Sequence, residues 1–413
     1  MGNNNEIKVY LTSRKSPTEY ATEQEITQYV INESFGDIVE TMDSTDYDFG
    51  IFTFGEINLV VQNKDGKFNS TDDWRSLFQF SRDLAKIRIS LVESDLTRSN
   101  QTITASTVTE TDLFIGIINE EATVTDAQNE TVNFIALSLN SIFRKTKVNA
   151  NVVSDADTVS AALYNMLNQD SVKSLLTVDS ANINPDNDFA IDVGAHFDNT
   201  VLKDSLNELL LASNSILYID SSLNVIVASR DERAALSTLT FYGPYDQYGR
   251  GNIQSIQDYN NGNHRMFNSV KINEIEANDS GFVEEFGLRQ KEITAEYLTT
   301  DATELTIANS LLAEFKEPRD EMQISLNAED IKSSQLLQKV SINYPLRLSI
   351  EDGDFLPIFG QAIYGDSETP YPKVHGGFSI HPNQVFKIIE KRINLQSMIG
   401  VLKLRQTNTG YSA

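Results

Sequence analysis

The sequence predicts a mainly β fold with α+β insertions, and three observations support this class. Segments that alternate apolar and polar residues recur along the chain, separated by turn-forming residues. Two stretches near the middle carry apolar residues at helical spacing instead. Apolar residues occupy 40% of the 413 positions, an ordinary share for a chain that buries a core. We therefore expect a folded protein of several domains, built largely from strands.

The first β domain is expected over residues 1–148. Alternation typical of half-buried strands occurs three times in it. Asn63-Lys64-Asp65-Gly66 forms a tight turn after the first of these segments, with Gly66 free to take a positive φ. Gly116 interrupts the apolar run 113–118, where a strand can bend or bulge. The alternating apolar positions are Ile57, Leu59 and Val61, then Ile87 and Ile89, then Val132, Phe134 and Ala136.

A small α+β middle domain is expected over residues 149–232. Residues 155–167 place Val159, Leu163 and Met166 on one helical face, and Asp155 or Asp157 is a candidate N-cap. A second helix is predicted over residues 201–211. The change from period 2 to helical spacing marks the boundary of this domain.

A linker and a second β domain are expected to follow. Residues 233–263 are rich in Gly, Asn, Asp and Tyr around position 250 and are predicted to form the linker. Residues 264–413 form the second β domain, with an inserted helix near 303–315. The stretch 357–382 holds four of the nine prolines and is predicted to be an exposed loop.

Composition excludes several classes of protein. With no cysteine, the chain has no disulfide, thiolate zinc site or cysteine nucleophile. Acidic residues outnumber basic ones by 59 to 33, a net charge of −26, which argues against a surface that grips nucleic acid. No apolar run is long enough for a membrane-spanning segment, and we expect no cleaved signal peptide at the first residues.

No motif in the sequence carries catalytic chemistry. The acidic run 184–198 is either a loose calcium loop or a solvated turn, and the four histidines lack the spacing of a metal site. The Tyr-rich segment 242–251 is either a stacking platform for a ligand or a packed connection. Paired carboxylates such as Glu284-Glu285 occur by chance in so acidic a chain. We therefore expect no catalytic residue, cofactor or metal. Trp74 is expected to pack beneath its own loop, with a contact to a neighbouring subunit as the alternative.

Several short motifs, in their order along the chain, resemble the phage tail hub or baseplate hub family. They are Val61–Phe68, which reads VQNKDGKF, then KIRI at Lys86–Ile89, LFIGI at Leu113–Ile117, NSVKI at Asn268–Ile272 and FGLR at Phe286–Arg289. This family is related to the base of type VI secretion spikes. The residues carried over as structural motif positions are Asn63, Gly66, Phe68, Phe114, Gly116, Asn268 and Gly287.

One hairpin departs from the family pattern. Leu223 stands where the family has a turn glycine, and we expect its neighbour Asn224 to take the positive φ instead.

The resemblance implies both an architecture and a function. Two β-barrel-like tube-type domains per chain, in a homotrimer, would form a pseudo-sixfold ring that adapts the sixfold tail tube to a threefold tip. The chain would be a structural virion protein at the tail tip, assembled in the host cytoplasm, and not an enzyme. Its partners would be the distal tail or tail tube protein ring, the tape measure protein and a tail fibre or spike protein.

DNA would pass only transiently through the lumen of such a trimer. The acidic charge then has two interpretations, solubility or a lumen that repels phosphate. Two other functions stay open from the sequence: the spike-base subunit of a bacterial contractile injection system, and a carbohydrate-binding or carbohydrate-acting β protein.

Overall fold

The computed structural model describes most of the chain, and the residues form two compact units. The described residues are 3–17, 19–31, 35–42, 50–69, 73–99, 102–232, 236–246, 248–260, 266–317, 319–345, 347–351, 354–358, 380 and 384–407. Unit 1 comprises Met1–Ser229, Thr294–Ile307 and Arg392–Met398, and unit 2 comprises Arg230–Ile293, Ala308–Lys391 and Ile399–Ala413. Both units are rich in strands, so the mainly β class predicted from the sequence is confirmed.

The first sheet of unit 1 is antiparallel throughout. Its strand order is β2-β1-β6-β7-β9-β5, and β8 pairs with β9 beside this path. The strands are β1 (Asn3–Thr12), β2 (Gln24–Glu25), β5 (Ile57–Gln62), β6 (Lys86–Ser99), β7 (Thr102–Ile118), β8 (Val124–Asp126) and β9 (Thr131–Ser138). Two short 3-10 helices, η1 (Thr27–Tyr29) and η3 (Glu120–Ala122), lie between them.

One face of this sheet builds the core, as the alternation predicts. On β9 the burial alternates along the whole strand, with Val132, Phe134 and Ala136 buried. The ring of Phe134 meets the rings of Phe68 and Phe78 edge to face at 6.0 and 5.9 Å. On β9 the opposite face carries Thr131 and Asn133 together with the half-buried Ile135 and Leu137.

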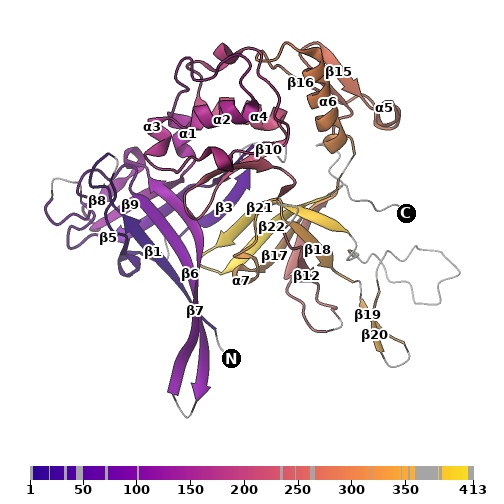
Figure 1. The fold of residues 1–413 in the computed structure, drawn as a ribbon. Coiled ribbons are helices and arrows are strands. Elements are labelled where there is room, and N and C mark those ends of the chain that lie inside the picture. Colours follow the sequence, from indigo (N-terminus) through magenta and orange to yellow (C-terminus); the bar gives the residue numbers. More distant parts are fainter. Residues whose placement is uncertain are drawn as a thin grey trace. The chain divides into compact units, whose positions relative to one another are not determined.

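Strands β6 and β7 continue beyond the rest of the sheet as a long two-stranded ribbon (Figure 1). Their pairing runs from Lys86 opposite Ile117 to Ser99 opposite Thr102. Strand β1 accompanies β6 only as far as Asp95, and β9 pairs with β7 only at Gly116–Ile118. The far part of the ribbon thus has no third strand among the described residues.

The second part of unit 1 combines a smaller set of strands with helices. The strand order is β11-β10-β4-β3, with β10 parallel to β4. The strands are β3 (Asp37–Met42), β4 (Gly50–Phe54), β10 (Ser215–Ile219) and β11 (Val225–Ser229). The helices are α1 (Ser141–Lys145), α2 (Val159–Leu167), α3 (Asp170–Lys173), α4 (Leu202–Ala212), η4 (Ser180–Asn182) and η5 (Gly194–Phe197).

Two local details of this part differ from the sequence predictions. Thr158 caps α2 by accepting a hydrogen bond from the Ala161 N–H, and neither Asp155 nor Asp157 does so. Asp155 accepts a hydrogen bond from the Gly194 N–H and Asp157 from the Ser154 N–H. These local hydrogen bonds compete with capping of the helix.

In the β10–β11 hairpin, Leu223 itself takes a positive φ of 66°, so the expectation for Asn224 was wrong. Asp220 accounts for this turn, because its carboxylate accepts from the N–H groups of Ser222 and Asn224 at 2.9 and 2.8 Å. These bonds hold the backbone where Leu223 would otherwise avoid the left-handed region.

Unit 2 contains three groups of strands. Strands β21, β22, β17 and β13 are neighbours in that order, and β18 pairs with β12 and β21; β15-β14-β16 form a second sheet and β19-β20 a hairpin. The strands are β12 (Leu239–Tyr242), β13 (Ser255–Asn260), β14 (Ser269–Ile272), β15 (Ile275–Asn278), β16 (Gln290–Ile293), β17 (Glu321–Asn327), β18 (Lys339–Asn343), β19 (Arg347–Glu351), β20 (Asp354–Ile358), β21 (Val385–Asn394) and β22 (Ile399–Gln406).

Three helices belong to this half of the chain: α5 (Ser280–Phe286), α6 (Asp301–Phe315) and α7 (Ala328–Ile331). The stretch 233–263, expected as a linker, contains β12 and β13. The loop predicted at 357–382 lies almost entirely outside the described residues. In the part of the chain that the structure describes, no helix is long and apolar enough to cross a membrane.

A buried ion cluster closes the C-terminal end of α6. The Glu314 carboxylate accepts hydrogen bonds from both Arg230 and Arg319. Both guanidinium groups are buried, with side-chain exposures of 2% and 3%. Burial alone would raise the pKa of Glu314, but the two arginine charges and their hydrogen bonds outweigh it and hold that pKa at about 2.

Candidate functional site

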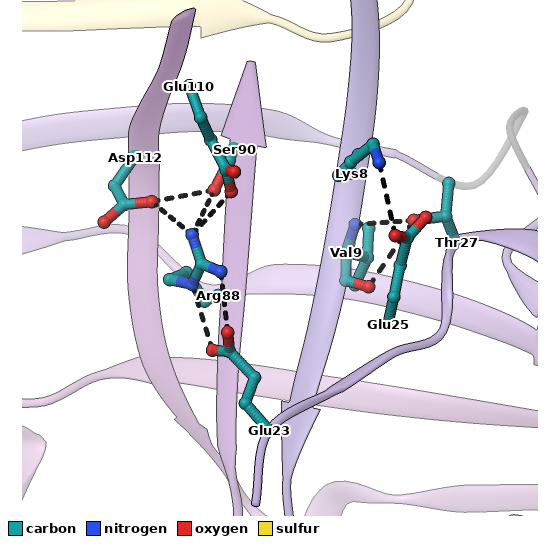
Figure 2. Close-up of polar contacts among 9 residues, drawn as sticks. All are labelled: Lys8, Val9, Glu23, Glu25, Thr27, Arg88, Ser90, Glu110 and Asp112. Carbon is teal, nitrogen blue, oxygen red and sulfur yellow. Dashed lines mark hydrogen bonds and ion pairs between the residues drawn. The ribbon is translucent and has the colours of Figure 1, made fainter. Parts of the chain in front are cut away.

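A cluster of charged side chains covers the polar face of β1, β6 and β7, with Arg88 at its centre (Figure 2). Along β6 the odd positions Ile87 and Ile89 enter the core, which sends Arg88 to the opposite face. The register of β6 and β7 shifts between Ile89 and Ser90, so Ser90 lies opposite Asp112. This irregularity brings acidic residues of β7 alongside Arg88.

The Arg88 guanidinium binds three carboxylates at once. It donates to Glu23 through Nε at 3.0 Å and Nη2 at 2.7 Å, a bidentate pair. Its Nη1 donates to Glu110 at 2.7 Å and to Asp112 at 2.8 Å. Ser90, fully buried, donates its hydroxyl to the same Asp112 oxygen at 2.7 Å. Two strands and the segment before β2 are therefore tied to one side chain.

In this cluster the negative charge of the carboxylates exceeds the positive charge of the arginine that they bind. The hydrogen bond to Glu23 and those to the two β7 carboxylates raise the pKa of Arg88, so it stays charged. Burial pushes the pKa of Glu110 upward, but hydrogen bonds from Arg88, Ser90 and Tyr10 outweigh this and lower it. Three carboxylates against one guanidinium leave this part of the face with net negative charge.

The cluster is built for rigidity more than for chemistry. Each carboxylate already holds a guanidinium proton, and the Arg88 guanidinium stacks 4.0 Å from the centre of the Tyr10 ring. Beside it, Lys8 pairs with Glu25 at 3.2 Å and the Val9 N–H donates to Thr27. No group of three or more acidic or histidine side chains in the described ranges is placed to hold a metal ion. What the cluster does is fix the base of the β6–β7 ribbon.

The outer edge of β7 is the other feature of this site. Strand β7 lies between β6 and β9, but β9 covers only its last three residues. Among the described strands, none pairs with the remaining outer edge from Thr102 to Ile115. Backbone N–H and C=O groups along such an edge can accept a further strand.

The first group of predicted motif residues forms the turn after β5. The Gly66 N–H donates to the Asn63 carbonyl at 3.0 Å, and Gly66 has a φ of +75°. Asn63 accepts from the Phe68 N–H through its side chain at 2.8 Å. Phe68 is fully buried and packs edge to face on Tyr29. These residues position the loop after β5, and none of the contacts described here joins them to the charged side chains of the Arg88 cluster.

Phe114 and Gly116 lie on β7, on the core side of the ribbon base. Phe114 is buried and its ring meets Phe54 edge to face at 5.6 Å. A Cβ at position 116 would collide with the Phe114 ring and the Leu137 carbonyl oxygen. The absence of a side chain at Gly116 therefore allows the close approach of β7 and β9 at this position.

Asn268 and Gly287 lie together in unit 2. The fully buried Asn268 amide donates to the carbonyls of Phe282 and Gly287 at 3.0 and 2.7 Å, and its oxygen accepts from the Arg289 N–H at 2.8 Å. Gly287 ends α5 with a φ of +74°. Asn268 thus joins the end of α5 to the start of β14.

Carboxylates of the acidic run 184–198 accept hydrogen bonds from backbone N–H groups of other segments. Asp188 accepts from the Ser160 N–H at 2.8 Å, Asp192 from the Thr299 N–H at 2.6 Å and Asp198 from the Asn151 N–H at 2.8 Å. Each carboxylate therefore ties down a different segment. His196 contacts Glu208 at 3.0 Å, and the other three histidines lie outside the described residues.

The Tyr-rich segment has a compact internal structure. Asp246, almost fully buried, is bound by Arg250 through two nitrogens at 2.8 and 3.1 Å. The Arg250 guanidinium stacks 3.8 Å from the centre of the Tyr242 ring and 4.7 Å from that of Tyr248. The ring faces that a ligand platform would need are therefore partly occupied by arginine.

Sequence reasoning missed two features. The Arg88 cluster depends on the register shift in β6 and β7, and an arginine inside an alternating strand was its only signal. The expectation that Trp74 packs beneath its loop was wrong, since 91% of its surface is exposed. The buried aromatic residue of that loop is Phe78, which is 1% exposed.

Known proteins resemble the chain in fold. No family model matches the sequence, and a search of curated proteins found no match. A tail protein from Neisseria meningitidis MC58 matches with a TM-score of 0.56 at 11% identity, covering 98% of this chain and 97% of that one. The prophage tail protein gp18 from Listeria monocytogenes EGD-e matches with a TM-score of 0.52 at 11% identity, covering 98% and 95%.

A 43 kDa tail protein of prophage MuSo2 from Shewanella oneidensis matches with a TM-score of 0.50 at 8% identity, covering 97% of each chain. The chain therefore has the fold of phage and prophage tail proteins along nearly its whole length. The fold that the short motifs predicted is confirmed.

Proposed function

We propose that this chain is a structural component of a phage or prophage tail, and that it forms the trimeric hub at the distal end of the tail tube. The observation that carries the proposal is the match with three tail proteins from end to end of both chains. In this role the chain is not an enzyme. It adapts a sixfold tube to a threefold tip and forms part of the channel through which DNA leaves.

The open edge of β7 supports assembly into a ring. A two-stranded ribbon is marginally stable alone, and its polar, β-branched sequence suits pairing with a further strand. A strand from a neighbouring copy can extend the sheet there, and three such head-to-tail contacts close a ring. The Arg88 cluster would hold the ribbon at the angle that this contact requires.

The acidic balance supports a channel that releases DNA. A net charge of −26 per chain repels phosphate, so a polymer inside such a ring would slide and not bind. The Arg88 cluster fits this reading, because its central cation is bound by three carboxylates. We propose the tail tube ring, the tape measure protein and a fibre or spike protein as the neighbours in the virion.

The test is the mass and shape of the purified chain. Light scattering on a sizing column should give three times the chain mass of 46.2 kDa, and negative-stain images should show a threefold ring. If the mass is that of a monomer alone, the tail tube protein is added and the experiment repeated. A chain that stays monomeric in both conditions contradicts the hub.

A further inference from the structure

Trp74 is a large aromatic side chain that the protomer leaves in water. It is the only tryptophan of the chain and is 91% exposed, while Phe80 six residues later is 46% exposed. A tryptophan exposed to this degree is unfavourable for a free protomer, since its indole offers a large apolar area. Tryptophan is also the residue most enriched among the energetic centres of protein interfaces.

Hydrogen bonds hold described residues on both sides of Trp74. Asn63 donates to Asn69 at 2.6 Å, Asn69 donates to Asp73 at 2.5 Å, and Arg75 binds the same Asp73 carboxylate at 2.7 Å. The Leu77 N–H donates to the Lys67 carbonyl at 2.7 Å.

Below this network, Phe68 and Phe78 anchor the segment in the core beside Phe134. The indole is thus held out by a fixed frame, which lowers the entropy lost when a partner binds.

The distribution of charged residues indicates which kind of surface binds over Trp74. Segments 12–20 and 63–86 are joined where Arg14 lies over the Phe80 ring and Tyr20 donates to the Leu84 carbonyl. Together they hold seven basic and five acidic residues, whereas the other residues hold 26 basic and 54 acidic. These two segments therefore carry no net negative charge, so an acidic surface can approach them with little repulsion, and the rest of the same chain is acidic overall.

We propose that Trp74 is the anchor of the contact between copies of this chain, docking on the acidic surface of the neighbouring copy. The proposal rests on the trimer proposed above and adds the residue that holds it. The described residues of these two segments (12–17, 19–20, 63–69 and 73–86), which we call the Trp74 corner, form one side of the contact. The Asp73–Arg75 pair flanks the anchor along the chain, and Phe80 adds a second exposed aromatic ring to the same segment.

Trp74 reports on its own environment, because it is the sole source of tryptophan emission. We would record emission and acrylamide quenching of the full chain over a wide concentration range, with light scattering on the same samples. On assembly, emission should shift to shorter wavelength and quenching should fall several-fold. A trimer whose indole stays quenched as in the dilute protomer overturns this proposal and leaves the hub intact. A monomer at every concentration, with the tail tube protein present as well as without it, overturns both.

Variants complete the test. Trp74→Ala should raise the concentration at half assembly by about tenfold or more, since anchor residues contribute most of an interface. Trp74→Phe should lie between it and the wild type. Leu288→Ala, which removes an exposed apolar side chain from unit 2, is the matched control and should assemble normally. If Trp74→Ala trimerises like the control, Trp74 is not the anchor, and protection by added tail tube protein would assign it to that partner.

Discussion

Arg88 on β6 and Asp112 on β7 are joined by a hydrogen bond of 2.8 Å, and Ser90 donates to the same carboxylate oxygen. This pair forms across a shift in strand register, and it holds the root of the ribbon that carries the open edge. At the ribbon base the Arg88 guanidinium therefore adds a side-chain link between β6 and β7 to their backbone pairing.

Replacing Arg88 should destabilise unit 1. Arg88→Ala leaves Glu23, Glu110 and Asp112 close together without a counter-charge, and we expect a loss of about 2–3 kcal/mol in unfolding free energy. Arg88→Lys keeps the charge but not the bidentate fork, so it should recover part of this. Lys8→Ala, which breaks only the pair with Glu25, should cost no more than about 0.5 kcal/mol. Urea unfolding at neutral pH measures all three, and an Arg88→Ala protein as stable as Lys8→Ala would contradict the role of the cluster.

Glu314 should contribute to stability in a pH-dependent way. Its pKa is about 2 in the folded protein against an ordinary value of 4.5, so its contribution is complete above about pH 5 and is lost as the pH falls from 4.5 towards 2. The difference corresponds to a contribution on the order of 3 kcal/mol. Glu314→Gln should therefore be less stable than wild type at pH 7, and the two should converge near pH 2.

Urea midpoints at several pH values would show this convergence. Glu121→Gln, at an exposed position in unit 1, serves as the control and should follow the wild type at each pH. A constant gap between Glu314→Gln and wild type from pH 7 to pH 2 would exclude the proposed cause.

Gly116 should not tolerate a methyl group. Gly116→Ala places a Cβ against the Phe114 ring and the Leu137 carbonyl, and moving β7 from β9 should cost about 2–3 kcal/mol. Gly36→Ala is the matched control, because no atom lies within 4 Å of the Cβ position there. Thermal unfolding should give a clearly lower midpoint for Gly116→Ala and little change for Gly36→Ala. Equal midpoints would show that β7 has room at this point.

Shortening the ribbon should abolish assembly and spare folding. Removing residues 96–105 and closing the hairpin with Asn-Gly deletes the part of β6 and β7 that lies beyond β1. We expect a monomer by light scattering with a thermal midpoint close to wild type. A trimer that forms normally without these residues would place the contact between copies elsewhere.

Much of the fold could be predicted because it depends on local patterns. Ile87 and Ile89 are buried as their alternation requires, and the helix expected over residues 201–211 is α4 at Leu202–Ala212. The N-cap of α2 could not be chosen correctly, because Asp155 and Asp157 were equally good candidates until the preceding turn was known. Thr158 became the cap once those carboxylates had other donors.

The candidate site was harder to predict for a different reason. The Arg88 cluster joins residues from position 23 to position 112, and their approach depends on how strands pair and where the register shifts. The burial of Trp74 was predicted wrongly, because a tryptophan near Leu77 and Phe78 is typical of a hydrophobic core. Which of these side chains enters the core is decided by the hydrogen bonds of the loop, and no alternation marks it.

The two units are interleaved along the chain, and this has a consequence for biosynthesis. Unit 1 starts at the N-terminus but includes Arg392–Met398, and Asn394 donates to Asp37 at 2.6 Å. A ribosome must therefore translate as far as Met398 before the first unit can close. Until then the nascent chain keeps an unfinished first unit, so a product that stops before Arg392 lacks one of the segments that complete it.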